Sequence, residues 1–169
     1  YIKQNSFDMV VHSAGYVGGI KANVTNPVDF LIKNLDIGRN LIIAAYVSGI
    51  KKVINLASSC IYPKNAQNPL KEEMILSGPL EPTNEGYALA KIITMRLCEY
   101  INREKPEFQY KTMIPCNLYG PNDKFDKDNA HLVPAIINKL HNALQNNEEF
   151  IEIWGNGTAK REFMYVGDL

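Results

Sequence analysis

The sequence lacks the features that would indicate a large or charged partner. No apolar run is long enough to cross a bilayer. The 18 basic and 18 acidic side chains give a formal net charge of zero, and no polybasic block is present, which argues against a nucleic-acid or membrane surface. We therefore expect a small-molecule ligand, with no nucleic-acid partner and no membrane association.

Cysteine is scarce, and its spacing excludes two common roles. Cys60, Cys98 and Cys116 form no CxxC pair and no Cys/His pattern typical of a metal site. An odd number of cysteines without a secretory signal favours free thiols in a reducing compartment. We therefore expect a cytoplasmic protein that binds no metal.

The dinucleotide fingerprint GxGxxG is also absent. Gly15, Gly18 and Gly19 follow the apolar run 7–12, but their spacing differs and no helix is expected to begin directly after them. These glycines predict a loop at the end of a buried strand.

What the sequence does contain is an alternation of apolar strands and amphipathic helices. In chain order, the expected strands and helices are 7–12, 27–48, 52–56, 86–103 and 111–114. This alternation predicts an α/β fold with a parallel, doubly wound sheet. The loops after the three strands then meet at one edge of the sheet, where such folds bind ligands.

The pattern changes after Pro121. A charged loop is followed by an expected helix over 131–144 and two strand candidates, 150–154 and 161–166. We therefore divide the chain into a first domain, 1–122, and a second, 123–169.

Tyr87 and Lys91 lie four residues apart, and hence one turn apart on the expected helix. A nearby ammonium lowers the pKa of a phenol from its usual value of about 10, so the tyrosine could exchange protons with a carbonyl near neutral pH. A serine from a neighbouring loop would complete a carbonyl-reducing site. The same spacing also occurs on many helices as a packed ring and a solvated amine, so the pair alone leaves both interpretations open.

Other candidates also have a plain structural interpretation. Cys60 lies in a polar loop directly after a strand, whereas Cys98 continues an apolar helix face and is expected in the core. His131 opens a helix, where an imidazole can act or merely cap. His12 is expected to pack at a strand end, and His141 to be an exposed helix residue.

Several longer stretches together carry a family resemblance. They are VVHSAGYVGGI, SSCIYP, LEPTNEGYALAK, IPCNLYGPND, the helix start HLVP at 131–134 and WGNGTAKREFMYV, and the resemblance runs through essentially the whole chain. In these motifs the sequence resembles the extended short-chain dehydrogenase/reductase family, and within it the enzymes that epimerise and reduce GDP-4-keto-6-deoxy-mannose. Cys116 departs from the pattern, since threonine is expected there in much of the family.

The resemblance implies a fold, a cofactor and a reaction. The fold is a Rossmann-type domain, whose later part is 1–122, followed by part of a nucleotide-sugar domain, 123–169. The first strands, with the phosphate loop, and the end of the substrate domain are expected outside this chain. The implied reaction is the NADPH-dependent inversion of C3 and C5 and reduction of C4 of the GDP-sugar to GDP-L-fucose, by a homodimer formed through helices 27–48 and 86–103.

The resemblance also implies roles for individual residues. Ser58, Tyr87 and Lys91 would form the reductase triad, with Cys60 as the base and His131 as the acid of epimerisation. NADP(H) would be lined by Leu56, Ala57, Ser58, Ser59, Tyr87, Lys91, Pro115, Cys116, Asn117, Leu118 and His131. The GDP-sugar would be contacted by Lys139, Trp154 and Arg161, of which the two cations suit phosphate.

Two alternatives remain open. The protein could act on another GDP-4-keto-sugar, such as a heptose, because loop residues outside the motifs can alter substrate choice. It could also be a non-catalytic Rossmann protein that binds a nucleotide. The presence of all five catalytic residue types at these spacings argues against the second.

Overall fold

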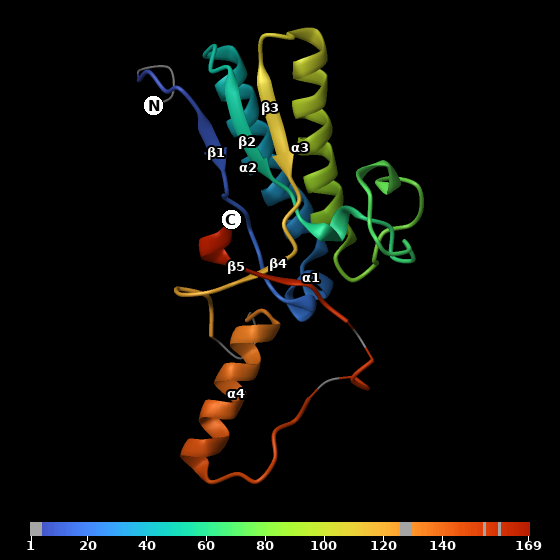
Figure 1. The fold of residues 1–169 in the computed structure, drawn as a ribbon, viewed down its shortest axis with the longest axis vertical. Helices are drawn as coiled ribbons and strands as arrows, with labels where there is room; N and C mark the ends of the chain where they lie inside the picture. The colour runs from blue at the N-terminus through green and yellow to red at the C-terminus, as the bar shows by residue number, and fades with distance from the viewer. Residues whose placement is uncertain (1–4, 126–129, 154, 159) are drawn as a thin grey trace.

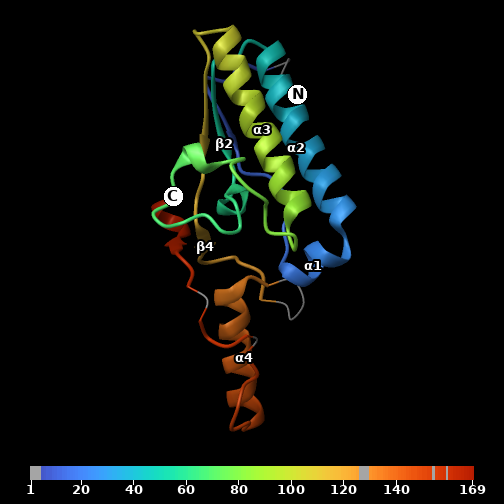
Figure 2. The same cartoon turned by 90° about the vertical axis from the view of Figure 1, so that its right-hand side faces the viewer.

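The computed structural model describes residues 5–125, 130–153, 155–158 and 160–169. Three strands, β1 (Val10–His12), β2 (Lys52–Leu56) and β3 (Gln109–Met113), form one parallel sheet in the order β1-β2-β3. Helices α2 (Pro27–Val47) and α3 (Glu85–Glu104) connect these strands and lie side by side on one face of the sheet (Figures 1 and 2). The expected parallel α/β sheet is thus confirmed.

Sequence signals explain where these elements begin and end. Asn26 and Pro27 open α2 at its N-cap and first position, and Gly49 follows its end with φ +74, a conformation that favours glycine. Between the helices and the sheet lies a hydrophobic core built from all of these elements. Its buried members are Ile42, Ala45, Ile50, Val53, Cys98, Ile101 and Tyr110.

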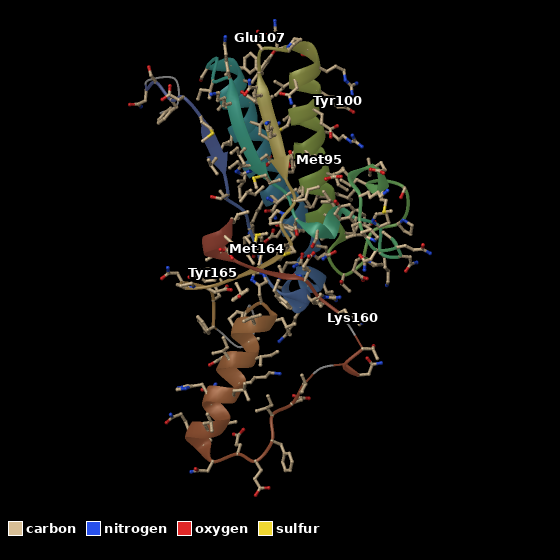
Figure 3. All side chains as sticks on the ribbon, viewed as in Figure 1. Met95, Tyr100, Glu107, Lys160, Met164 and Tyr165 are labelled. Carbon is tan, nitrogen blue, oxygen red and sulfur yellow. The ribbon has the colours of Figure 1, made fainter. Side chains whose placement is uncertain are left out.

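The second part of the chain forms a separate small sheet and a helix. Strands β4 (Asn117–Tyr119) and β5 (Phe163–Tyr165) pair in parallel, and their tyrosines, Tyr119 and Tyr165, pack with ring centroids 5.8 Å apart. Helix α4 (Leu132–Asn146) extends away from both sheets (Figure 1). Figure 3 shows Met164 and Tyr165 of β5 between the three-stranded sheet and α4.

Short helices complete the fold. The α-helix α1 (Ile20–Thr25) is joined by three 3-10 turns, η2 (Ser59–Ile61), η3 (Glu72–Met74) and η4 (Val166–Asp168). Helix α1 begins directly after Gly19, so the expectation that no helix follows the glycines is wrong. Asn23 accounts for the difference, because its side-chain amide donates to the carbonyls of Gly18 and Gly19, at 2.9 and 3.0 Å, and folds the loop into a turn.

The strand expected over 150–154 is not formed in its described part, 150–153. A strand needs a neighbouring strand, and here the carbonyl of Glu152 instead accepts a hydrogen bond from Lys139 Nζ at 2.8 Å. The strand expected over 161–166 is only the shorter β5, because its pairing partner β4 has three residues. Among the described residues, no helix is both long and apolar enough to span a bilayer.

Candidate active site at the carboxyl edge of the sheet

The loop after β2 is anchored on the start of α3. Ser59, Cys60 and Ile61 form η2, and the fully buried Ile61 packs in a second hydrophobic cluster. The other buried members of this cluster are Ala57, Ile75, Leu80, Ala88, Ile92 and Met95. The backbone N–H of Ala57 also donates to the carbonyl of Met113 on β3, at 2.8 Å. The polar residues of the loop are therefore held rigidly above the end of the sheet.

Lys91 links α3 to the end of β2. Its side chain is only 7% exposed, and Nζ donates to the carbonyl of Leu56 at 2.9 Å. The same ammonium lies 5.7 Å from the ring centroid of Tyr87, one turn earlier. Burial lowers the pKa of Lys91, and the proximity of Cys60 partly opposes that effect. The expected triad and the expected base are thus brought together.

Burial makes Tyr87 a weaker acid than the sequence-based expectation, and it acts in the same way on Cys60. The pKa of Tyr87 is raised, first by burial and then by the negative charge that Cys60 would carry. The ammonium of Lys91, 5.7 Å from the ring centroid, does not outweigh these two effects. Burial likewise raises the pKa of the Cys60 thiol, although a hydrogen bond from Ser58 and the charge of Lys91 oppose that effect. Because their pKa values lie above the ordinary ones, both the Tyr87 phenol and the Cys60 thiol are protonated at neutral pH.

Near Lys91 a row of polar side chains crosses the sheet, which the sequence interpretation missed. His12, Asn55 and Thr112 are partners in register across the three strands, and Asn55 Nδ2 donates to Thr112 Oγ1 at 3.2 Å. Burial, and secondly the charge of Lys91, lower the pKa of His12 to about 4. His12 is therefore a neutral core residue, which confirms its expected packing role and adds a neighbour, Lys91.

Asn34 also contributes to the site, and the sequence interpretation missed it. From the buried side of α2 its amide donates to the carbonyl of Tyr16 at 2.9 Å, and its Oδ1 accepts from the N–H of Tyr16 at 2.8 Å. A Cβ added at Gly15 would lie 3.4 Å from Asn34 Oδ1 and 3.9 Å from Lys91 Nζ. Asn34 thus fixes the glycine-containing loop beside Lys91, and an asparagine among apolar helix positions was the signal.

The remaining candidates lie on or near the second sheet. Pro115 and Cys116 join β3 to β4, and Asn117 and Leu118 are the first residues of β4. His131 is the N-cap of α4, with its ring facing Asp123 at 3.8 Å.

The expected substrate-contacting residues are not gathered into one site in the described chain. Lys139 binds the carbonyl of Glu152, and the exposed Arg161 donates to the carbonyl of Lys160 at 3.1 Å. Trp154 lies outside the described residues. His141 is exposed and Cys98 is 1% exposed, both as expected. Within the described ranges, no three His, Cys, Asp or Glu side chains cluster as metal ligands.

A parallel sheet whose carboxyl edge carries a serine loop and a Tyr-x-x-x-Lys helix defines a Rossmann-type protein of the dehydrogenase class. The model of the NAD dependent epimerase/dehydratase family matches residues 1–169. The chain is 56% identical over its whole length to the GDP-L-colitose synthase of Yersinia pseudotuberculosis, covering 55% of it, and 51% identical to the GDP-L-fucose synthase of Azorhizobium caulinodans, covering 54%.

A solved structure of similar fold is MlghC, the GDP-mannoheptose C4 reductase from Campylobacter jejuni with NADP bound. It is 30% identical, with a TM-score of 0.84, and the match covers 97% of this chain and 57% of that one. The chain therefore belongs to the NAD-dependent epimerase/dehydratase family, among the extended short-chain dehydrogenase/reductases. It spans about half the length of the relatives it matches.

Proposed function

We propose that the full-length protein uses NADPH to invert C3 and C5 and to reduce C4 of GDP-4-keto-6-deoxy-mannose, giving GDP-L-fucose. The observation that carries this proposal is the meeting of Ser58 and Cys60, from the loop after β2, with Tyr87 and Lys91, from α3. A plain reductase needs only three of these groups, and Cys60 supplies an additional proton acceptor.

The residues at the sheet edge fit a nicotinamide cofactor. Lys91 presents a buried cation beside Gly15, whose missing Cβ leaves backbone accessible next to it. The residues proposed to line NADP(H) are Leu56, Ala57, Ser58, Ser59, Tyr87, Lys91, Pro115, Cys116, Asn117, Leu118 and His131. When bound, this cofactor supplies the hydride for carbon C4.

In the reduction, Ser58 and Tyr87 would bind the carbonyl oxygen of the sugar. The raised pKa of Tyr87 keeps its phenol protonated, which is the form that donates a proton to the developing alkoxide. Lys91 would stabilise the phenolate left behind, because its ammonium lies above the same ring. The environment of Tyr87 thus suits the role of a proton donor.

In the epimerisation, the C4 ketone acidifies the protons on C3 and C5. Cys60 would remove one of them as the thiolate, and His131 would return a proton from the opposite face. Burial disfavours that thiolate, so its formation depends on the groups that oppose burial, first among them Ser58 and Lys91. The GDP moiety would be bound by Lys139, Trp154 and Arg161, which we propose on their side-chain chemistry.

Replacing Cys60 with serine tests the two-stage reaction. We expect wild-type full-length protein in deuterated water to incorporate deuterium at C3 and C5, detected by NMR, while NADPH is oxidised at 340 nm. Cys60→Ser should lose this incorporation by about 10²-fold or more but should still reduce the keto-sugar. Cys98→Ser, which alters a core thiol, is the control. NADPH oxidation by wild type with no deuterium at either carbon would reduce the proposal to a plain reductase.

A second candidate substrate is favoured by the 56% identity to a GDP-L-colitose synthase. Colitose lacks the C3 hydroxyl of fucose, so C3 is not a stereocentre and only C5 needs inversion. Comparing kcat/KM for the keto-sugars with and without the C3 hydroxyl distinguishes the two candidates, and a GDP-keto-heptose tests the heptose alternative. A full-length protein that binds NADPH but turns over none of these would instead be a binding protein.

We also propose that the full-length protein is a homodimer formed through α2 and α3. Apolar side chains are exposed on both helices, namely Val28, Ile32, Ile43 and Val47 on α2 and Leu89, Ile93 and Tyr100 on α3. Exposed apolar residues of this number on adjacent helices are typical of an interface. We place the reaction in the cytoplasm because all three cysteines are free thiols.

Ile93→Asp tests this dimer. The charge is expected to convert the dimer to a monomer in analytical ultracentrifugation, because a carboxylate would be desolvated at the interface. Lys52→Asp, at the exposed start of β2, is the control that changes charge elsewhere. A sedimentation coefficient for Ile93→Asp equal to that of the wild type at micromolar concentration would rule out this interface.

A further inference from the structure

We infer that Asp123 is a positioning residue that holds the ring of His131 for proton transfer. This inference rests on the proposed function, in which His131 is the acid of epimerisation. The structure assigns to Asp123 the contact with Nδ1, which leaves Nε2 for the sugar.

The backbone of His131 is fixed by α4, but its ring is not. His131 is the N-cap of the helix, and its carbonyl accepts the N–H of Ala135 at 2.9 Å. Its side chain makes no capping hydrogen bond, and 49% of it is exposed. Because the imidazole makes no hydrogen bond to the first turn of α4, the helix does not fix the orientation of the ring.

Asp123 supplies the missing constraint. Its Oδ1 lies 3.8 Å from Nδ1 of His131 and also accepts the backbone N–H of Lys124 at 2.8 Å. The Asp123 side chain is only 18% exposed and lines a cavity of about 110 Å³ together with Tyr119 and Val133. Among the described residues, no other carboxylate lies within ion-pair distance of His131.

A plain interpretation is a surface ion pair, which stabilises a protein by about 0–1 kcal/mol. Two observations favour a positioning role. The carboxylate is the more buried partner, and its oxygen is already oriented by a backbone donor, so it is the fixed member of the pair. The separation of 3.8 Å exceeds a hydrogen bond, but catalytic contacts are often long in unliganded proteins and shorten when substrate binds.

The proton balance explains why Nδ1 needs a partner. Cys60 thiolate takes a proton from the sugar carbon, so that a C–H bond breaks and an S–H bond forms. Protonated His131 then donates its Nε2 proton to the other face of that carbon and becomes neutral, with its remaining proton on Nδ1. That proton faces Asp123, so the carboxylate stabilises the tautomer that donation leaves behind.

The test compares four forms of the full-length protein: wild type, Asp123→Asn, His131→Asn and the double variant. Asp36→Asn is the matched control, because it makes the same change in an exposed ion pair with Arg39 on α2. Inversion at C5 of GDP-4-keto-6-deoxy-mannose is followed by NMR in deuterated water, and NADPH oxidation is followed separately. Long-range ¹H–¹⁵N correlations of the His131 ring report, without any turnover, which ring nitrogen carries the proton.

We expect Asp123→Asn to slow inversion by about 10-fold to 100-fold with KM unchanged, and the double variant to be no slower than His131→Asn. The neutral ring should carry its proton on Nδ1 in wild type and lose that preference in Asp123→Asn. Wild-type inversion rates and an unchanged tautomer in Asp123→Asn would overturn the inference. If wild type inverts nothing, the proposed function fails, and the tautomer alone still decides the role of Asp123.

Discussion

Replacing Lys91 with methionine is expected to lower the reduction rate of the full-length protein by about 10²-fold to 10⁴-fold. Methionine retains most of the volume of the lysine chain, but it loses the ammonium that binds the Leu56 carbonyl and lies above the Tyr87 ring. The phenolate formed after proton transfer then has no neighbouring cation. Stopped-flow measurement of NADPH oxidation at saturating sugar checks this effect.

The same variant should not be less stable. Because burial lowers the pKa of Lys91, the charged lysine is less favourable in the folded state than in the unfolded one. This cost is full below the lowered pKa and disappears as the pH rises through the ordinary value of 10.5. Lys91→Met should therefore melt at or above the wild-type temperature at pH 7, with that advantage shrinking toward pH 10.

Lys52→Met is the control, because Lys52 is exposed at the opposite end of β2 and should change neither quantity. Reduction by Lys91→Met within tenfold of the wild-type rate would contradict the role of Lys91. A large fall in its melting temperature at pH 7 would show that the lysine is needed for structure instead.

Gly38→Val is expected to destabilise the protein by about 3 kcal/mol, out of a typical total of about 5–15 kcal/mol. A Cβ at Gly38 would clash with Cγ2 of Thr94 and would lie 3.4 Å from Nε2 of His12. Thr94 is buried and β-branched, so its side chain cannot rotate away at low cost. Crowding therefore exceeds the gain of about 1 kcal/mol from removing a helical glycine. Chemical denaturation measures the loss.

A double-variant series identifies the cause. Gly38→Ala introduces the same Cβ contact, and Thr94→Ser removes Cγ2 while keeping the Oγ1 that donates to the Lys91 carbonyl. The double variant should lose less free energy of unfolding than the two single variants lose together. Strict additivity would mean that the contact between α2 and α3 at this position does not limit packing.

The sequence predicts the parts of the fold that follow from apolar periodicity and from residues that begin or end helices. Helices α2 and α3 begin and end within one residue of the expected bounds, because Asn26-Pro27 and Gly49 are strong local signals. The run 150–153 was predicted wrongly because a strand depends on a partner elsewhere in the chain. Strand β4 was not expected for the same reason, since its three residues are extended only beside β5.

In the candidate site, too, some features could be predicted from the sequence and others could not. The proximity of Ser58, Cys60, Tyr87 and Lys91 follows from topology, since parallel strands end at one edge. The acidities do not, because the spacing of Tyr87 and Lys91 says nothing about burial, and burial is the largest effect on the pKa of both Tyr87 and Cys60. The roles of Asn34 and His12 likewise depend on which helix face is covered.

The pairing of β4 with β5 has a mechanical consequence. The chain leaves the three-stranded sheet through β4 and returns through β5, so that residues 120–162 are joined to the rest of the protein at this one pair of strands. Helix α4, which contains Lys139, and its N-cap residue His131 lie between these two strands in the sequence. A movement of α4 relative to the three-stranded sheet would therefore require a change of backbone conformation at β4 and β5. The position of His131 relative to Cys60 therefore depends on the backbone at this pair of strands.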